Sequence, residues 1–344
     1  MRPPLVHLVN PMWAVAGSEG RTLELYRRIR ERARVRLWSM YRPHPHLSAL
    51  APIEPIEPWR LRFPRGGTLV FVGVYYRYGN WVHLSGASRR IIVYNSPHPH
   101  ILRRRVRKLG AFGIHRVEVV HASRWLREES GLDGPVQPSP IDLRRFSPKD
   151  GRGEGPFVVG RLSRSQPEKH NERDPALYGQ LVKEGFAVRI MGGEVIRQHG
   201  PLDPRVEILP EGARDPAEFL HGLDCFLYRT SDRWKEPHGR VVQEAMACGL
   251  PVVCGRSGGM AEYVEHGRNG FLFDTDREAL EIVRSLRADK ATCRRVGLAA
   301  RNTMEHILSA ESIQRTVDFY LHGRPPEDED SPFEPEPNRA DSPR

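Results

Sequence analysis

The chain has 344 residues, 39% of them hydrophobic, and carries a formal net charge of +10. This length and composition favour a globular protein with two domains that have separate cores. The most apolar uncharged stretches, 68–76 and 245–255, are too short to cross a bilayer, which argues against a membrane-spanning helix. The four cysteines show no metal-type spacing, so we expect reduced, largely buried thiols in a cytosolic protein.

The charge is unevenly distributed between the two halves of the chain. Residues 1–150 hold 26 Lys and Arg against 11 Asp and Glu, a net charge of +15, whereas the remaining residues have a net charge of −5. A basic first half favours an anionic partner, either a membrane surface, a phosphorylated lipid or a nucleic acid.

Short apolar runs alternate with amphipathic segments in the first half of the chain. Residues 5–9 are predicted to form a buried strand, and a turn that contains Gly17 follows. Leu23, Tyr26 and Ile29 then fall on one face of a predicted helix. Further strands are predicted at residues 35–38, 68–74, 90–94 and 117–120. This alternation is typical of a parallel, doubly wound α/β sheet.

A stretch rich in Pro, Gly and charge, residues 134–156, separates this alternation from a second one. A helix is predicted around residues 176–183, and strands are predicted at 157–159, 187–191, 206–209, 225–228, 251–253 and 271–273. Two successive α/β units with a cleft between them are suited to hold a ligand at the carboxyl ends of their strands.

These patterns predict a division of the chain into two domains and additional terminal segments. Residues 1–145 form the first domain in this interpretation, 146–156 the linker and 157–305 the second domain. Residues 306–323 are predicted to form a C-terminal helix that packs back on the first domain. The acidic, Pro-rich tail 324–344 is expected to be disordered and to carry no chemistry.

The most informative segment is 236–253, which contains two glutamates eight positions apart. Glu236 and Pro237 are expected at the start of a helix, where an acid meets the positive end of the helix dipole. Free backbone N–H groups near Gly239 can donate to hydroxyl or phosphate oxygens. Glu244, two turns further on, can accept two hydrogen bonds from a vicinal diol. For two isolated glutamates, a capping acid and a surface acid would be the more ordinary interpretation.

The context of these glutamates resembles family 4 of the glycosyltransferases, whose E-x7-E motif has the same surroundings. The similarity extends over several further segments, which are the glycine loop at 16–19, the linker entry at 136–146, the VGRL segment at 158–162 with Glu168 and Lys169, the GG-x-x-E loop at 257–262 and the Asn-Gly turn at 267–271. The resemblance implies a GT-B fold, in which two Rossmann-like doubly wound α/β domains face each other across a cleft.

The resemblance also implies roles for residues of the second domain. Glu236 would face the donor sugar, the backbone amides of His238, Gly239 and Arg240 would bind its hydroxyls, and Pro237 would belong to the same donor-binding segment. Glu244 would bind the ribose diol. Arg161 and Lys169 would neutralise the diphosphate without a metal ion, an arrangement in which a forked cation and a point charge stabilise an anionic leaving group. Because these two cations are further apart than is usual in the family, Arg164 is an alternative, and Lys169 could also be a solvated surface cation.

The first domain would contribute a glycine loop and a histidine. Gly17 and Ser18 would approach the diphosphate from across the cleft, although a plain strand-to-helix turn is the alternative. Many family members place a histidine near the reacting centre, and we choose His98 over His100 for this role. Neither is distinguished from a surface histidine by the sequence. His238 replaces the usual aromatic residue of the motif, which leaves the sugar selectivity open.

The implied function is a retaining hexosyltransferase that uses a UDP- or GDP-linked sugar and needs no cofactor or metal ion. The Arg-rich, Lys-poor composition is typical of a GC-rich bacterial source. The acceptor would be a glycan or a lipid-linked molecule in cell-surface polysaccharide synthesis. Alternatives are a catalytically silent binder of nucleotide sugars, an epimerase on the same fold and a basic nucleic-acid-binding protein. The last lacks any helix-turn-helix, zinc-ligand or RNP-type motif, so we expect no nucleic-acid partner.

A basic segment at 101–109 predicts a membrane contact for this cytoplasmic protein. Leu102, Val106 and Leu109 fall on one helical face, and the rest of the surface is cationic through Arg103, Arg104, Arg105, Arg107 and Lys108. Such a helix can lie on anionic lipid, which would make the protein peripheral at the inner membrane face. A solvated basic helix is the alternative interpretation.

Overall fold

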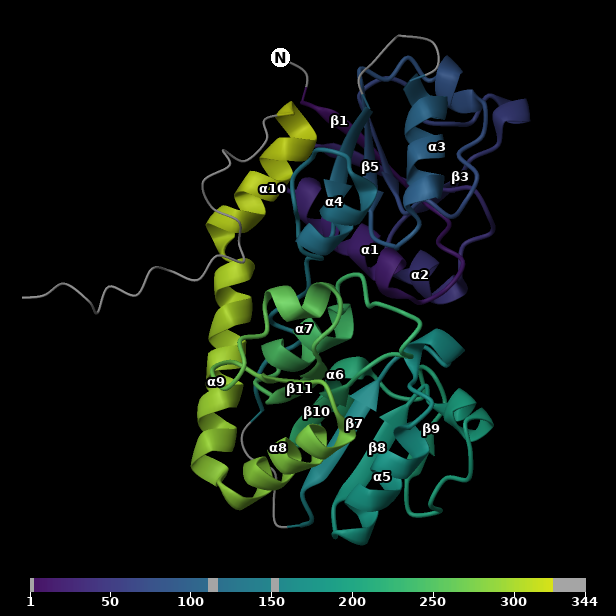
Figure 1. Ribbon diagram of the computed structural model, residues 1–344. Helices are drawn as coiled ribbons and strands as arrows, with labels where there is room; N and C mark the ends of the chain where they lie inside the picture. The colour runs from purple at the N-terminus through teal and green to yellow at the C-terminus, as the bar shows by residue number, and fades with distance from the viewer. Residues whose placement is uncertain (1–2, 111–116, 150–154, 324–344) are drawn as a thin grey trace, which may run out of the picture.

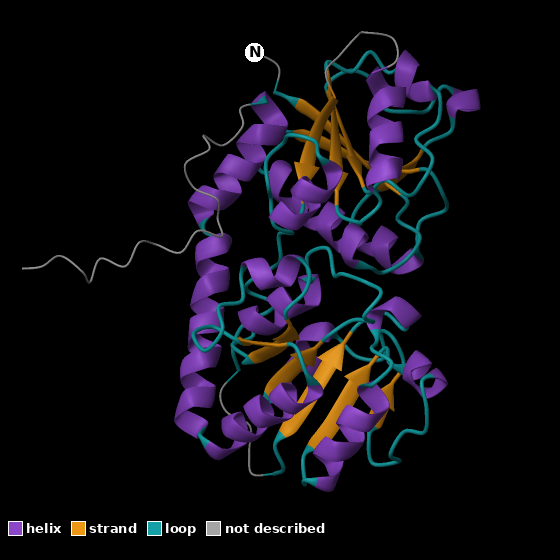
Figure 2. Cartoon of the chain, viewed as in Figure 1, coloured by secondary structure: helices purple, strands orange, loops and turns teal. Residues whose placement is uncertain are grey.

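A computed structural model describes residues 3–110, 117–149 and 155–323 of the chain. The expected disorder of the tail 324–344 concerns residues outside this described part. Two parallel six-stranded sheets form the centres of two domains stacked one above the other (Figure 1), as the sequence predicted. Helices cover both faces of each sheet (Figure 2), so the strands are buried on both sides.

The first sheet has the strand order β3-β2-β1-β4-β5-β6. Its strands are β1 (Leu5–Asn10), β2 (Arg34–Ser39), β3 (Ile53–Pro55), β4 (Thr68–Val72), β5 (Arg89–Tyr94) and β6 (Val117–His121). Its helices are α1 (Gly17–Ile29), α2 (Pro45–Leu50), α3 (Pro99–Gly110) and α4 (Arg124–Ser130), with single turns η1 (Pro58–Arg60) and η2 (Trp81–Leu84). The edge strand β3 was not predicted, because it has three residues and lies between prolines.

The second sheet repeats this topology in the order β12-β11-β10-β7-β8-β9. Its strands are β7 (Val158–Leu162), β8 (Ala187–Met191), β9 (Glu207–Leu209), β10 (Cys225–Tyr228), β11 (Val252–Gly255) and β12 (Phe271–Phe273). The helical elements are α5 (Asp174–Lys183), α6 (Pro216–His221), α7 (Arg240–Ala247), α8 (Asp276–Ala288) and α9 (Lys290–Ile307), with η3 (Pro167–Lys169), η4 (Glu194–Gln198) and η5 (Gly259–Glu262).

Both sheets therefore have a topological switch point, between β1 and β4 in the first and between β7 and β10 in the second. Chain connections leave such a pair of strands in opposite directions, which opens a crevice at their carboxyl ends. The carboxyl ends of the two sheets point toward each other (Figure 2). The topology thus brings the segments after β1, β4, β7 and β10 together at the boundary between the domains.

The C-terminal helix α10 (Ala310–His322) crosses from the second domain to the first. The long helix α9 lies along the second domain, and α10 continues along the first (Figure 1). Val317, Phe319 and Tyr320 are buried in the same hydrophobic cluster as β1 and α1. Arg89 donates to the carbonyls of Phe319 and Tyr320 over 3.1 and 3.0 Å, which fixes the helix to the sheet.

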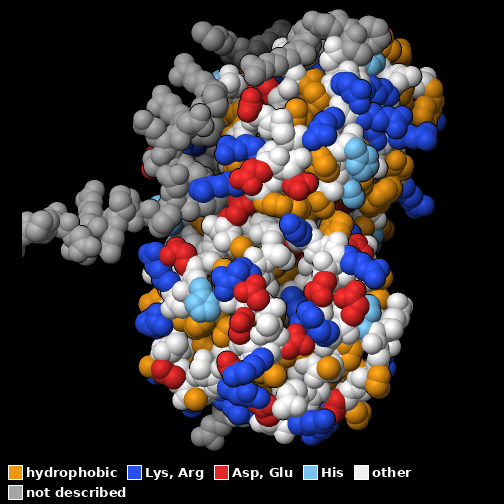
Figure 3. All heavy atoms as spheres, in the orientation of Figure 1, with side chains coloured by type: hydrophobic (Ala, Val, Ile, Leu, Met, Phe, Trp, Pro, Cys, Tyr) orange, Lys and Arg blue, Asp and Glu red, His pale blue; other side chains and the backbone are white. Residues whose placement is uncertain are grey.

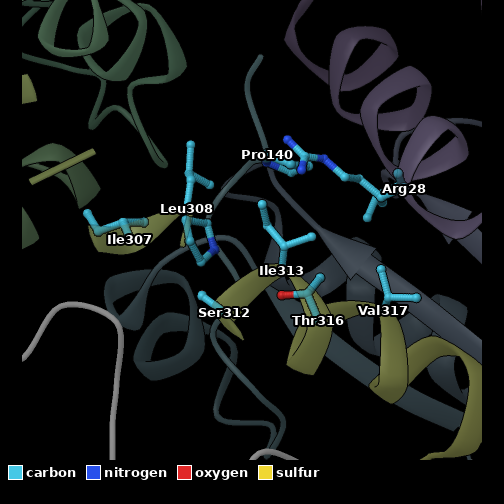
Figure 4. A pocket seen from close by; sticks show the side chains of 10 residues that line it. Arg28, Pro140, Ile307, Leu308, Ser312, Ile313, Thr316 and Val317 are labelled. Carbon is cyan, nitrogen blue, oxygen red and sulfur yellow. The ribbon is translucent and has the colours of Figure 1, made fainter. Parts of the chain in front are cut away.

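A small pocket lies where α1, the interdomain segment and the junction of α9 and α10 meet (Figure 4). Its lining is mostly apolar and comprises Leu25, Arg28, Pro138, Pro140, Ile307, Leu308, Ser312, Ile313, Thr316 and Val317. This lining includes none of the residues that the sequence predicted for the donor site. The pocket is part of the connection between the domains.

Candidate functional site

The segment with the two glutamates connects β10 to α7 at the domain boundary. Helix α7 begins at Arg240, three residues later than predicted, because Gly239 has a left-handed conformation with φ of 74°. The hydroxyl of Tyr263 donates to the carbonyls of His238 and Gly239 over 2.8 and 2.9 Å. Pro237 therefore lies in a buried bend before the helix. The first N–H groups of a helix have no partner within the preceding turn, so they are directed toward this bend.

Glu236 forms a buried ion pair with Lys169. The ammonium lies 2.8 Å from Oε2 of Glu236, and both side chains are about one-tenth exposed. The hydroxyl of Tyr228 donates to the same oxygen over 2.7 Å. Burial by itself would raise the pKa of Glu236, but the Lys169 charge and these hydrogen bonds hold that pKa below its usual value. The structure thus brings together two predicted site residues, with a tyrosine that the sequence identified only as the end of a strand.

Arg161 is fully buried near the carboxyl end of β7, contrary to its predicted contact with the diphosphate. Its side chain is 0% exposed and donates to the carbonyls of Arg229 and Lys169. The guanidinium also stacks on Tyr228 at 4.6 Å from the ring centroid. Successive side chains of a strand point to opposite faces of the sheet, and helices cover both faces of this one. The Arg161 side chain is therefore directed into the protein interior, and its predicted contact with the diphosphate was wrong. Arg161 instead supports the backbone of Lys169.

Arg164 is the exposed cation after β7 and lies opposite the first domain. It interacts electrostatically with Glu19, in the first turn of α1. Ser18, from the predicted glycine loop, accepts hydrogen bonds from Asn10 over 2.8 Å and from Tyr75 over 3.1 Å. These contacts join the segments after β1 and β4 at the switch point of the first sheet. The structure thus places Arg164 near the start of α1, and its contact with a diphosphate stays a prediction.

Glu19 is a buried carboxyl that the sequence did not select, although the glycine loop contained it. It is 1% exposed, and its Oε1 has no hydrogen-bond partner among the described residues. Burial raises its pKa to about 7. A carboxyl with this pKa changes its charge at physiological pH, directly beside the start of α1.

We expect Glu19→Gln to remove a pH dependence of stability. The folded protein retains the Glu19 proton up to about pH 7, whereas the unfolded chain loses it near 4.5. The folded state thus binds more protons between these values, and the free energy of unfolding falls as pH rises through this window, by about 3 kcal/mol. Urea unfolding at pH 5 and pH 8 measures this slope. It should persist in the exposed-residue control Glu31→Gln, and an equal slope in Glu19→Gln would contradict the assignment.

Glu244 is paired with Arg240 one helical turn earlier. Nε of Arg240 lies 2.9 Å from Oε1 of Glu244, and the same guanidinium donates to Oγ of Ser139 and the carbonyl of Pro140. It also packs against the start of α1, since a Cβ added at Gly20 would lie 3.5 Å from Cζ of Arg240. Burial raises the pKa of Glu244 despite this cation. A ribose diol would therefore have to share Glu244 with Arg240.

His238 is buried and neutral, because burial lowers its pKa to about 3. Its Nε2 lies 3.0 Å from the backbone N–H of Ser139, which donates to it, and 2.8 Å from Oε1 of Gln243. The contact with Ser139 fixes the imidazole to the interdomain segment. The His238 side chain is thereby engaged within the protein, and its carbonyl accepts a hydrogen bond from the hydroxyl of Tyr263.

His98 lies in the loop after β5 and faces the second domain through Trp234. The two rings have a centroid distance of 6.3 Å, and the Lys169 ammonium lies 5.6 Å from the centroid of Trp234. Burial lowers the pKa of His98. His100 is 6.2 Å from His98 and more exposed. The structure thus places His98 near the Glu236 and Lys169 pair, with Trp234 between them.

Among the described residues, no group of three or more His, Cys, Asp and Glu side chains is arranged to hold a metal ion. The described helices also include none that combines the length and apolar character needed to cross a membrane.

The basic helix α3 buries Leu102 and Leu109 as predicted from its pattern. Two of its cations are engaged within the domain: Arg103 donates to the carbonyl of Ser130, and Arg105 donates to that of Val74. A group of Lys and Arg side chains covers this region of the first domain (Figure 3). Arg104, Arg107 and Lys108 remain as its outward-facing cations.

The sequence of this chain is similar to those of known glycosyltransferases. Residues 180–303 match the family described as "Glycosyl transferases group 1". A GDP-mannose-dependent alpha-mannosyltransferase of Mycolicibacterium smegmatis is 34% identical over 55% of this chain and 48% of its own length. The N-acetyl-alpha-D-glucosaminyl L-malate synthase of Bacillus anthracis is 37% identical over 50% of this chain and 47% of its own. The chain thus spans about half the length of these curated relatives.

The fold is shared with solved structures over nearly the whole chain. The crystal structure of Anabaena HepE in complex with UDP-glucose has a TM-score of 0.71 at 19% identity, and the match covers 93% of this chain and all of that one. The two domains therefore form a GT-B fold. In sequence, residues 180–303 match the glycosyl transferases group 1 family, in agreement with the resemblance found in the sequence motifs.

Proposed function

We propose that this protein is a retaining hexosyltransferase that uses a UDP- or GDP-linked sugar and requires no metal ion. The observation that carries the proposal is the buried pair of Lys169 and Glu236, which lies beside the switch point of the second sheet. A fixed cation beside a fixed carboxylate in a partly dry site is suited to a substrate that carries both a diphosphate and a hydroxylated ring. The related mannosyltransferase and the UDP-glucose complex of the structural neighbour favour these donors.

The residues of the site would bind three parts of the donor, which are the diphosphate, the sugar and the ribose. Lys169 and Arg164 would stabilise the negative charge that develops on the leaving diphosphate, while the start of α1 at Gly17 and Ser18 approaches it from the first domain. Glu236 and the backbone from His238 to Arg240 would orient the sugar. Glu244 would accept hydrogen bonds from the ribose.

Retention would follow if attack and departure occur on the same face of the sugar. The bond from the anomeric carbon to the β-phosphate oxygen breaks, and the acceptor oxygen forms its bond to that carbon on the same side. The acceptor proton passes to the departing phosphate oxygen, so no protein group has to remove it. The protein's contribution is then positioning and electrostatic stabilisation of the leaving group.

A thermal-shift experiment with UDP, GDP, UDP-glucose and GDP-mannose tests donor binding. A nucleotide at a hundredfold excess over its Kd should stabilise the folded state by about 2.7 kcal/mol. We expect the shift to survive EDTA and to weaken in Glu244→Ala, with an affinity loss of about 10- to 100-fold, because a charge-assisted hydrogen bond to the ribose is removed. The exposed α8 residue Glu281 provides the control Glu281→Ala. Failure of all four ligands to shift the melting curve would overturn the proposal.

The acceptor would be a glycan or a lipid-linked molecule of the cell surface, reached at the cytoplasmic face of the membrane. The outward-facing cations of α3 support this part of the proposal, because anionic lipid attracts such clusters by about 1 kcal/mol for each cation near the surface. Sedimentation with phosphatidylglycerol vesicles, compared with phosphatidylcholine vesicles, is the measurement.

Removal of the α3 cations should weaken binding to the anionic vesicles by about 10- to 100-fold. The test variant replaces Arg104, Arg107 and Lys108 by serine. The charge-matched control replaces Arg277, Lys290 and Arg294, which are exposed cations of the second domain. Equal binding of both variants, or of both vesicle types, would count against a membrane contact at α3.

A silent binder of nucleotide sugars is the second candidate. The burial of Arg161 favours it, because a guanidinium that donates to the carbonyls of Arg229 and Lys169 does not stabilise the charge on a leaving diphosphate. Hydrolysis of a bound donor in the absence of acceptor separates the two functions: an enzyme releases free sugar slowly, whereas a silent binder releases none.

A further inference from the structure

Glu262 belongs to the second domain, but its carboxylate binds the backbone of the first. Oε2 accepts the N–H of Arg124 over 2.8 Å, and Oε1 accepts the N–H of Trp125 over 2.7 Å. The neighbouring Lys235 ammonium lies 6.0 Å from the centroid of the Trp125 ring. Two charge-assisted hydrogen bonds and a cation on an aromatic ring thus join the domains at α4. The sequence had marked the segment 257–262 without a role for this glutamate.

The glycine pair before Glu262 packs on the donor-site backbone. The N–H of Gly259 donates to the carbonyl of Glu236 over 2.8 Å. A Cβ added at Gly258 would lie 2.5 Å from the same carbonyl oxygen, and one added at Gly259 would lie 2.2 Å from that of Pro237. Gly259 also faces the first domain, since its added Cβ would lie 2.9 Å from Cβ of Ser123. One peptide is therefore in close contact with both the donor site and the other domain.

From this geometry we propose that Glu262 is a positioning residue that couples the approach of the two domains to the placement of Glu236. The proposal rests on the proposed function of Glu236 at the donor. The short turn η5 connects the two contacts, so a displacement of α4 is transmitted to Glu236 and Pro237 through Gly258 and Gly259. Because such coupling is reciprocal, a nucleotide held near Glu236 in turn favours the contact of Glu262 with α4.

Amide hydrogen exchange of the full chain, read by NMR or by mass spectrometry of short peptides, tests the coupling without any ligand. In Glu262→Ala we expect faster exchange at Arg124 and Trp125, and also at Gly259 and across 234–239. Glu262→Gln retains one acceptor oxygen and should give an intermediate result. The control is Glu265→Ala, a glutamate of the same segment whose side chain is 45% exposed and pairs with Arg268. Faster exchange confined to Arg124 and Trp125 would overturn the coupling and leave Glu262 as a local cap.

A second measurement adds the nucleotide and the reaction. UDP or GDP should slow exchange at Arg124 and Trp125 in the wild type and leave it unchanged in Glu262→Ala. With a donor, Glu262→Ala should lower kcat by about tenfold and change the KM for the donor less than twofold, because the donor groups themselves remain. A normal kcat would overturn the proposal. If no nucleotide binds the wild type, the proposed function fails, while the exchange pattern of the ligand-free variants still decides whether the domains are coupled.

Discussion

Replacement of Lys169 by alanine is expected to lower kcat for sugar transfer by about 100- to 1000-fold, the typical effect of removing one fixed group that stabilises the leaving charge. The ammonium is 2.8 Å from Glu236 and would also face the diphosphate. Tyr228 still donates to Glu236 in the variant, so we expect a loss of only about 2 kcal/mol in the free energy of unfolding. Steady-state kinetics with the donor selected by thermal shift gives the rate.

The matched control is Lys183→Ala, which removes an exposed lysine at the end of α5. Its kcat should remain within about twofold of the wild type, since surface charges remote from the site contribute little. A Lys169→Ala enzyme with unchanged kcat would show that the ion pair is structural, and the proposed function would lose the observation on which it rests.

Arg161→Met is expected to lower the free energy of unfolding more than it lowers the affinity for a nucleotide. The side chain is fully buried, and its removal leaves the carbonyls of Arg229 and Lys169 without their donor. Breaking a buried charged network of this kind costs about 3 to 5 kcal/mol, which corresponds to a fall in Tm on the order of 10 °C. Differential scanning calorimetry measures the change.

Arg164→Met provides the comparison, because Arg164 is the exposed cation of the same segment. We expect its Tm to change by less than about 2 °C and its affinity for UDP or GDP to fall about tenfold, through loss of a cation from the diphosphate. The opposite pattern, a stable Arg161→Met protein that has lost nucleotide binding, would restore the original prediction for Arg161.

Most of the fold could be predicted because both domains are built from short apolar runs. A parallel strand covered on both faces has a nearly continuous apolar sequence, and residues 225–228 and 187–191 have this character. The elements that were missed, or whose ends were predicted at the wrong residue, are those stabilised by residues far away in the sequence. The three residues of β3 pair only with β2, and the start of α7 is set by Gly239 and the distant hydroxyl of Tyr263.

The candidate site was predictable in its residue types and only partly in their partners. The resemblance led to Glu236 and Lys169, and the structure joins them as an ion pair. It could not indicate that the Arg161 side chain points into the core. On a strand that helices cover on both faces, the direction of a side chain depends on the packing of those helices. It also gave no signal for the pairing of Arg240 with Glu244 or for the burial of Glu19.

The sequence by itself determined the two α/β units, their parallel sheets and the chemistry available in the segment from Glu236 to Glu244. Local patterns are sufficient for this, because strand and helix periods depend on neighbours along the chain. Only the tertiary structure decided which charges meet and which segment connects the domains. Residues 124, 169, 236 and 262 are far apart in the sequence, and their contacts depend on how two switch points face each other, which no local pattern encodes.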